Sequence, residues 1–235
     1  MNAELATLFS EARAAGRATL DEPAAKRVLA AHGIAVPAGV RISSPGSSTG
    51  GALPATLKPP FAAKLISPDA SHKSDVGGVR LGVADAAEAL AAARGLERLA
   101  RDQGLAFEGV LVEEMAPAGV ELVIGGVMDA RFGPVIMLGL GGIFVEIFGD
   151  TAFRVCPIDR IDAKDMIDEL KGAPLLRGAR GRKPVDEERV VDALLKVSAL
   201  LVDAEGELAE LDINPLIVSE HAAIACDARI VLAKK

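Results

Sequence analysis

The sequence contains no tryptophan and no tyrosine, and only seven of its 235 residues are phenylalanine. It therefore offers few aromatic rings to stack on nucleobases, which is how many single-strand nucleic-acid binders hold their ligand. Positive charge is also in deficit, because 26 Lys and Arg stand against 33 Asp and Glu, for a formal net charge of −7. Acidic chains are repelled by nucleic acid and by anionic membranes. We expect neither as a partner.

Cysteines and long hydrophobic runs are scarce as well. The two cysteines, Cys156 and Cys226, lack the close spacing of a zinc site, so we expect reduced and mostly buried thiols. The longest apolar runs, such as Val135 to Val145, are short and rich in glycine, which predicts no transmembrane helix. The N-terminus is an amphipathic charged helix without the apolar core of a signal peptide. We predict a cytoplasmic protein.

Half of the residues are hydrophobic, mostly Val, Ile, Leu and Ala, which is enough for a folded core. The order of periodic segments predicts an α+β protein in two lobes. We place an N-terminal helix at 1–20, a first lobe at 21–108 and a second lobe at 109–235. Helices are expected at 22–32, 84–103, 163–171 and 186–204. Strands are expected at 34–42, 61–66 and 79–83, then at 109–115, 120–129 and 133–138 as an antiparallel meander, and finally at 207–218 and 222–232 as a hairpin.

The final hairpin carries candidate metal ligands. Polar and apolar residues alternate in its first strand, so Asp212 and Asn214 share one face. A two-residue turn at 220–221 would place Asn214 opposite Asp227, and Asp212 opposite Arg229. Oxygen ligands on two neighbouring strands suit Mg²⁺ held partly by substrate phosphates. The alternative is a solvated sheet face with cross-strand ion pairs.

Charged residues at strand positions are further candidates. Lys64 lies within an otherwise apolar strand, where its ammonium needs an anion: a nucleotide phosphate, a structural carboxylate, or access to solvent. Glu113 and Glu114 end another apolar strand, and Glu121 lies near the start of the next. Carboxylates at such a connection could contact adenine and ribose, although acidic residues at strand ends are common without any role.

Two glycine-rich segments complete the candidates. Ser-His-Lys-Ser-Asp-Val-Gly-Gly at 71–78 joins polar side chains to Gly77 and Gly78, whose N–H groups could approach an anion. Leu-Gly-Leu-Gly-Gly at 138–142 follows a predicted strand. Neither segment has the phosphate-loop pattern, and the second lacks the full dinucleotide fingerprint. On pattern alone, His72 is a solvated loop residue.

Taken together, these segments resemble the nucleotide-binding subunit of the ADP-forming acyl-CoA (acetyl-CoA) synthetases, relatives of succinyl-CoA synthetase. The resemblance covers nearly the whole chain. Its most specific parts are His-Lys-Ser-Asp-Val-Gly-Gly and Asp-Ile-Asn-Pro-Leu, in this order and spacing. The matching segments lie at 22–26, 33–37, 66–79, 112–115, 132–135, 139–146 and 210–216.

The resemblance implies an ATP-grasp fold, in which nucleotide lies between two α+β lobes. It further implies that Lys64 holds the phosphates of ATP. Glu113, Glu114 and Met115 would line the adenine site, and Glu121 would lie near the ribose. The cofactors implied are ATP or ADP together with Mg²⁺.

The same resemblance assigns the chemistry. Asn214 and Asp227 would bind magnesium, in agreement with the hairpin pairing, and N–H groups of the loop with Gly77 and Gly78 would help to neutralise phosphate charge. His72 would accept the phosphoryl group, because the family passes phosphate through histidine. Neutral imidazole is a good nucleophile near pH 7.

The implied reaction is acyl-CoA + ADP + phosphate ⇌ carboxylic acid + CoA + ATP. Asp75 or Glu146 would orient the ring of His72. A CoA-binding nucleotide fold is missing from the sequence, so a CoA-binding α subunit is expected, as a separate chain or a fused domain, in an α2β2-type hetero-oligomer. Two other hypotheses remain: an ATP-grasp ligase that forms an acyl-phosphate directly, and a non-catalytic regulatory nucleotide-binding module.

Overall fold

The structure, a computed structural model, divides into two compact units, Pro37–Ala116 and a second unit made of Met1–Val36 with Pro117–Lys235. Each unit has its own hydrophobic core. The structure describes every residue except 1–2, 46–52, 71–72, 143–148, 182 and 235. Among the helices of the described part, none combines the length and apolar character that crossing a membrane requires.

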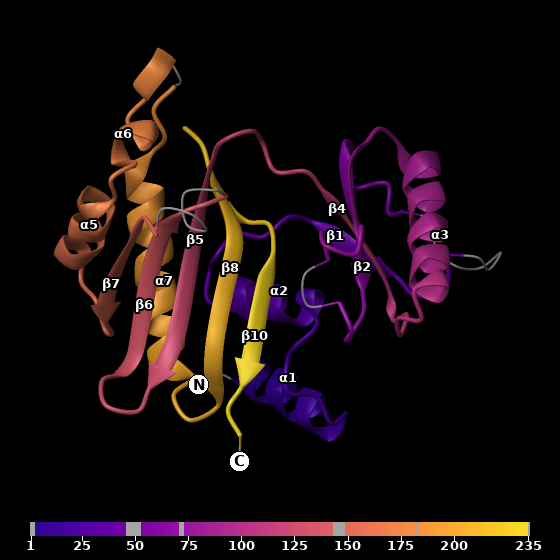
Figure 1. Cartoon of the computed structure of the whole chain (residues 1–235), viewed down its shortest axis with the longest axis horizontal. Coiled ribbons are helices and arrows are strands. Elements are labelled where there is room, and N and C mark those ends of the chain that lie inside the picture. The colour runs from indigo at the N-terminus through magenta and orange to yellow at the C-terminus, as the bar shows by residue number, and fades with distance from the viewer. Residues whose placement is uncertain (1–2, 46–52, 71–72, 143–148, 182, 235) are drawn as a thin grey trace. The chain divides into compact units, whose positions relative to one another are not determined.

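The smaller unit is a four-stranded antiparallel sheet with one long helix, α3 (Ala86–Asp102), packed on it (Figure 1). The Asp85 side chain caps this helix by accepting the Glu88 N–H, and the alanines and leucines on its inner side reach the strands. The strands, in spatial order, are β1 (Gly39–Ile42), β4 (Gly109–Glu114), β2 (Phe61–Ile66) and β3 (Val79–Val83).

The larger unit is built on a six-stranded antiparallel sheet. Its strands, in spatial order, are β10 (Ala228–Leu232), β8 (Leu208–Val218), β5 (Val120–Asp129), β6 (Gly133–Leu140) and β7 (Thr151–Val155), with β9 (Ala223–Ala225) also paired to β8. Its helical elements are α1 (Ala3–Ala14), α2 (Glu22–Ala31), α5 (Arg160–Glu169), α6 (Ala173–Leu176), the 3₁₀ turn η1 (Ala179–Gly181) and α7 (Glu187–Asp203).

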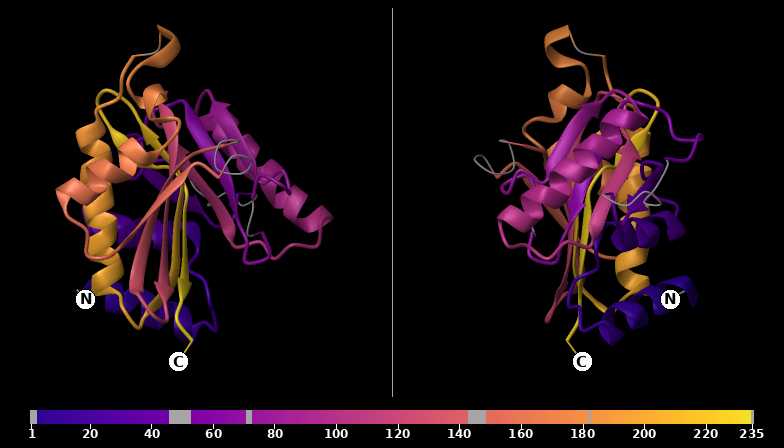
Figure 2. Two further views of the ribbon diagram at one scale, coloured as in Figure 1. Left: turned by 60° about the vertical axis from the view of Figure 1, so that its left-hand side comes forward. Right: turned by 90° about the vertical axis from the view of Figure 1, so that its right-hand side faces the viewer.

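Helices α5 and α7 lie on one side of this sheet (Figure 2). Gly126 lets α7 pack closely, because a Cβ at that position would lie 2.6 Å from the Leu201 side chain. Gly125, the neighbouring residue of β5, meets Met137 on the opposite face. On that opposite face, the large apolar side chains Val127, Phe153 and Val155 are exposed.

The division between the units differs from the predicted lobe boundary near residue 108. Strand β4 pairs with β1 and with β2, so it lies inside the smaller sheet. The predicted meander of β4, β5 and β6 is therefore wrong: β5 and β6 pair as predicted, but β4 belongs to the other sheet. The N-terminal helices also belong with the C-terminal residues, since Leu20 N–H donates to Ile230 and Leu232 N–H donates to Ala18. The alternation of apolar and polar residues predicts that a segment is a strand, but it does not predict which strand it pairs with.

Other elements agree in position, with local differences. Strand β1 is shorter than the predicted 34–42, and α5 begins at Arg160 because Asp159 forms a capping box there with Asp162. Two elements were not predicted from the sequence. One is β7, a short strand whose exposed Phe153 and Val155 lie on the open face of the sheet. The other is α6, a single helical turn.

Candidate functional site

The C-terminal hairpin has the predicted register. Asp212 pairs with Arg229, and the Asn214 N–H donates to the Asp227 carbonyl over 3.3 Å. A tight turn sets this register, because Ser219 N–H donates to the Ala222 carbonyl over 2.8 Å. Two residues therefore form the turn, as the sequence indicated. The pairs of β8 with β9 and β10 follow from that count as far as Val231, after which the register shifts by one residue.

The donor set at this position fits a magnesium ion. Asn214 is exposed and Asp227 is half-buried, and the Asp227 carboxylate uses Oδ1 to accept the Ala228 N–H over 2.8 Å. Among the described residues, no group of three or more His, Cys, Asp and Glu is placed to hold a metal. An amide oxygen from β8 and a carboxylate oxygen from the residue before β10 match an ion that keeps water and phosphate in its remaining positions.

Glu121 and the second glycine-rich segment meet in the same unit. Glu121 is exposed near the start of β5, and its carbonyl accepts the Gly141 N–H over 2.8 Å. A Cβ on Gly141 would lie 2.9 Å from the Glu121 Cβ, so this glycine permits close packing beside Glu121. Glu146, a predicted orienter of the histidine, lies outside the described residues.

Lys64 and Glu113 form a buried ion pair in the smaller unit. Lys64 Nζ lies 2.6 Å from Glu113 Oε1, and both side chains are less than 10% exposed, at 8% and 2%. Lys64 pairs with Leu111 across β2 and β4, so Glu113 is its diagonal neighbour. Gly39 of β1 leaves room, because a Cβ there would lie 2.8 Å from the Glu113 Cβ. Of the partners open to Lys64, the structure supplies a carboxylate.

We expect Glu113→Gln to lower the free energy of unfolding by about 3 kcal/mol, because it removes the carboxylate charge that lies 2.6 Å from the buried Lys64 ammonium. Glu114→Gln is the matched control. The Glu114 carboxylate accepts the Lys58 N–H over 2.8 Å at a more exposed position, so its loss should cost less than about 1 kcal/mol. Urea unfolding of both variants measures the difference, and equal losses would show that the pair is not strongly coupled.

The end of β4 presents side chains rather than free N–H groups. Glu114 N–H donates to the Ala38 carbonyl and Met115 N–H donates to the Pro60 carbonyl, over 2.9 and 3.0 Å. Met115 is 37% exposed, and its sulfur lies 3.0 Å from the Gly82 nitrogen. A ligand at this strand end would therefore meet the Met115 side chain rather than these two N–H groups.

The first glycine-rich segment closes on itself. Gly78 N–H donates to Lys73 over 2.6 Å and Gly77 N–H donates to Ser74 over 3.0 Å. Gly77 has φ +69°, and a Cβ on Gly78 would lie 2.9 Å from the Lys73 carbonyl oxygen. The expectation that these two N–H groups face an anion is therefore not met: they hold the turn beside β2, where Leu65 N–H donates to Gly78. His72 lies outside the described residues.

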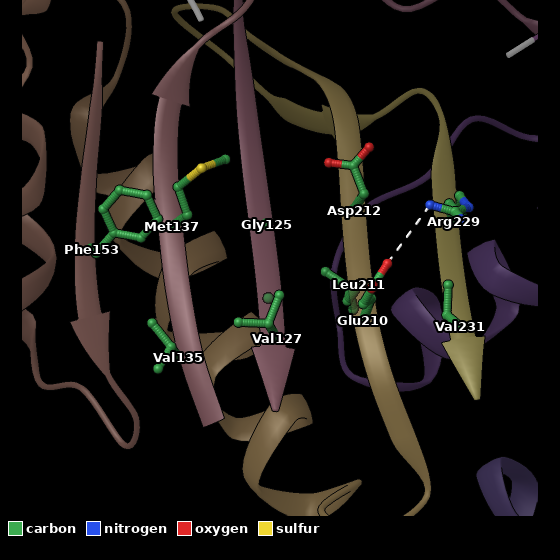
Figure 3. A pocket seen from close by; sticks show the side chains of 11 residues that line it. Gly125, Val127, Val135, Met137, Phe153, Glu210, Leu211, Asp212, Arg229 and Val231 are labelled. Atoms are coloured by element: carbon green, nitrogen blue, oxygen red, sulfur yellow. Dashed lines mark ion pairs between the residues drawn. The ribbon is translucent and has the colours of Figure 1, made fainter. Parts of the chain in front are cut away.

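The open face of the larger sheet carries a hollow of about 310 Å³ that was not predicted from the sequence (Figure 3). Two rows of cross-strand neighbours form most of its floor, one from β6 to β10 and the other from β7 to β10. The alternation of side chains in each strand can be read from the sequence, but which strands are neighbours cannot. One row is Val135, Val127, Glu210 and Val231. The other row is Phe153, Met137, Gly125, Asp212 and Arg229.

The predicted site residues thus fall into two groups. Asn214, Asp227 and Glu121 belong to the larger unit, together with the hollow. The smaller unit holds the buried Lys64, the strand end and the loop with the two glycines, namely Glu113, Glu114, Met115, Gly77 and Gly78.

Comparison with known proteins identifies this arrangement. Residues 11–232 match the ATP-grasp domain family. The β subunit of acetate–CoA ligase [ADP-forming] I from Pyrococcus furiosus is 40% identical over 227 residues, which are 96% of each chain. Acetate–CoA ligase [ADP-forming] I from Archaeoglobus fulgidus is 42% identical over 182 residues, which are 75% of this chain and 26% of that longer protein.

Solved structures agree. Acetyl-coenzyme A synthetase 1 of Ca. Korarchaeum cryptofilum, in complex with coenzyme A, Ca-AMPCP and HgCl⁺, superposes with a TM-score of 0.89 at 38% identity, covering 97% of this chain and 99% of that one. A second structure of that synthetase, with coenzyme A and Mg-AMPPCP, has its phosphohistidine segment pointing towards the nucleotide binding site; its TM-score is 0.79 at 38% identity, over 97% of this chain and 100% of that one. This chain belongs to the ATP-grasp family, among the β subunits of the ADP-forming acetate–CoA ligases.

Proposed function

We propose that this chain is the nucleotide-binding subunit of an ADP-forming acyl-CoA synthetase. The enzyme would interconvert acyl-CoA, ADP and phosphate with carboxylic acid, CoA and ATP. The observation that carries the proposal is the hairpin that sets Asn214 opposite Asp227. It occurs in a chain that matches a Pyrococcus furiosus β subunit over 96% of both lengths.

Asn214 and Asp227 would hold Mg²⁺ with one oxygen each. When bound there, Mg²⁺ would neutralise charge on the nucleotide phosphates. Asn214 lies in β8 and Asp227 lies directly before β10, and the backbone hydrogen bond from the Asn214 N–H to the Asp227 carbonyl holds the two residues together. This rigidity would orient the phosphates for an in-line transfer.

His72 would be the phosphoryl acceptor. The lone pair of a neutral ring nitrogen attacks the γ-phosphorus of ATP, the bond to the bridging oxygen breaks, and ADP leaves with that electron pair. The other ring nitrogen keeps its proton and donates it in a hydrogen bond, for which Asp75 or Glu146 would be the acceptor. The support is the sequence motif at 72–78 and the phosphohistidine segment of the Korarchaeum synthetase.

The smaller unit would supply the remaining contacts to the nucleotide. Lys64 would contact phosphate, and Glu113 would hold its ammonium in place, since the two already lie 2.6 Å apart. Glu113, Glu114 and Met115 would contact adenine. In the larger unit, Glu121 would bind the ribose. Gly77 and Gly78 would form the turn that shapes the loop with His72.

The partner would be a CoA-binding α subunit. Relatives occur as a separate β subunit and as part of a much longer chain, which supports a partner that is either separate or fused. We propose an α2β2-type assembly. Without the partner, this chain would bind nucleotide but would not make acyl-CoA.

Phosphorylation tests this function. The purified chain is incubated with γ-labelled ATP and Mg²⁺, with and without the CoA-binding subunit. We expect acid-labile, base-stable label on this chain, which is the stability pattern of phosphohistidine, and loss of the label when acid and CoA are added with the partner. Binding of Mg-nucleotide without any label would instead support a ligase that forms acyl-phosphate directly, and absence of nucleotide binding would support a regulatory module.

A further inference from the structure

The hollow on the open sheet face lies one row away from the proposed metal ligands. Asp212 precedes Asn214 by two residues in β8, and Arg229 follows Asp227 by two residues. A spacing of two residues along a strand is about 6.8 Å. A guanidinium on this row can therefore reach phosphate oxygens that are bound at the metal position. Figure 3 shows Arg229 at the β10 side of the hollow, beside Glu210 and Asp212.

Arg229 carries the positive charge among the residues that line the hollow. Its Nη1 lies 3.8 Å from Glu210 Oε2, and the two side chains are 47% and 57% exposed. An ion pair this long and this exposed adds little to stability and does not lock the guanidinium in place. If Arg229 had a purely structural role, we would expect it to form a short, buried ion pair, as Lys64 does with Glu113. The geometry leaves the guanidinium free to turn towards a ligand.

The rest of the hollow is mixed in character, because the carboxylates of Glu210 and Asp212 line it beside Arg229. Val127, Met137 and Phe153 make one side of it apolar. Arginine also presents several N–H donors in a planar fork that matches two oxygens of one phosphoryl group.

We infer that Arg229 binds the terminal phosphoryl group of the nucleotide and neutralises its oxygens during transfer. This inference rests on the proposed function, because it takes Asn214 and Asp227 as the metal position. Arg229 makes and breaks no covalent bond in this role. It would contact the γ-phosphoryl oxygens of ATP, and its contact would be lost in ADP, which ends one phosphoryl group earlier.

Arg229→Gln tests the inference by the difference between two nucleotides. We expect the affinity for Mg²⁺ with methylene-bridged, non-hydrolysable ATP to fall at least about 10-fold more than the affinity for Mg-ADP, and the rate of phosphoryl labelling to fall about 100-fold. Arg229→Lys should recover part of the loss, because it keeps the charge but not the planar fork. Calorimetric titration and single-turnover labelling measure these effects.

Glu210→Gln is the matched control, because it removes the carboxylate that Arg229 faces and leaves the guanidinium. If Arg229 served only that ion pair, Glu210→Gln would reproduce the effects of Arg229→Gln, and the inference would be overturned. Equal losses for the ATP analogue and for ADP would overturn it as well. If wild type itself failed to bind Mg-ADP, the proposed function would fail first. If wild type binds nucleotide and becomes labelled, and Arg229→Gln does both equally well, the inference about Arg229 is overturned and the proposed function stands.

Discussion

Asp227→Asn is expected to weaken Mg-nucleotide binding at least about 100-fold, and Asn214→Ala to have a similar effect. Asp227→Asn keeps the volume and an oxygen that can accept the Ala228 N–H, so it removes the charge without removing that hydrogen bond. Asn214→Ala leaves the backbone bond from Asn214 to Asp227 in place. Titration of nucleotide at several Mg²⁺ concentrations separates a loss of metal binding from a general loss of affinity.

The control for these substitutions is Glu220→Gln in the same hairpin. Glu220 lies in the exposed turn, where its carboxylate faces Lys183 over 3.3 Å. Its replacement should leave both the magnesium dependence and the affinity as in wild type. Wild-type affinity of Asp227→Asn at every Mg²⁺ concentration would mean that the hairpin does not hold the metal, and that the paired oxygens belong to a solvated sheet face.

His72→Ala is expected to reduce phosphoryl labelling of the chain by at least about 1,000-fold, because the side chain that accepts the phosphoryl group is removed. Nucleotide binding should be retained, since the binding groups proposed for ATP lie elsewhere. Formation of acyl-CoA with the partner subunit should fall in parallel with the label. Labelling with γ-labelled ATP and a separate binding titration measure the two properties on the same preparation.

The sequence has three histidines, which makes the control direct. His221 lies in the hairpin turn with its side chain 83% exposed, so His221→Ala should label as wild type does. His32 is less suitable, because its Nδ1 lies 3.2 Å from the Val28 carbonyl oxygen and its Nε2 lies 3.6 Å from Asp203 at the end of α7. Label that persists on His72→Ala would exclude this histidine as the acceptor.

The proposed site explains why large apolar side chains are exposed on the larger unit. Val127, Phe153 and Val155 lie on the face opposite to α7. Large apolar side chains that are exposed together on one face are typical of a binding surface. Val127 and Phe153 line the apolar side of the hollow, across the sheet from Arg229 on β10.

Where the fold follows short-range rules, the sequence predicted it closely. The register of the last hairpin depends on the length of one turn and on strict alternation, and both can be counted in the sequence. That count alone placed Asn214 opposite Asp227, and the structure confirms the pairing. The helix that starts after Asp21 was also visible, because a capping side chain and a proline in the first turn are local signals.

Where a feature depends on distant partners, the sequence predicted the element but not its place. Strand β4 was expected, yet nothing in its own residues indicates that it pairs with β1 and β2 instead of β5. For the same reason, the partner of Lys64 stayed open among a phosphate, a carboxylate and solvent, and the tertiary structure settled on Glu113. The N–H groups of Gly77 and Gly78 were assigned to an anion until the loop could be seen to use them.

The sequence by itself determined the α+β class, the family motifs and the pairing of the two proposed metal ligands, because each is written within a few consecutive residues. The tertiary structure decided which strands share a sheet, which charge neutralises Lys64, and that side chains from five strands form one hollow with Arg229 at its edge. The physical reason is that side-chain period follows from local backbone geometry, whereas strand pairing and burial depend on contacts between residues far apart in the chain.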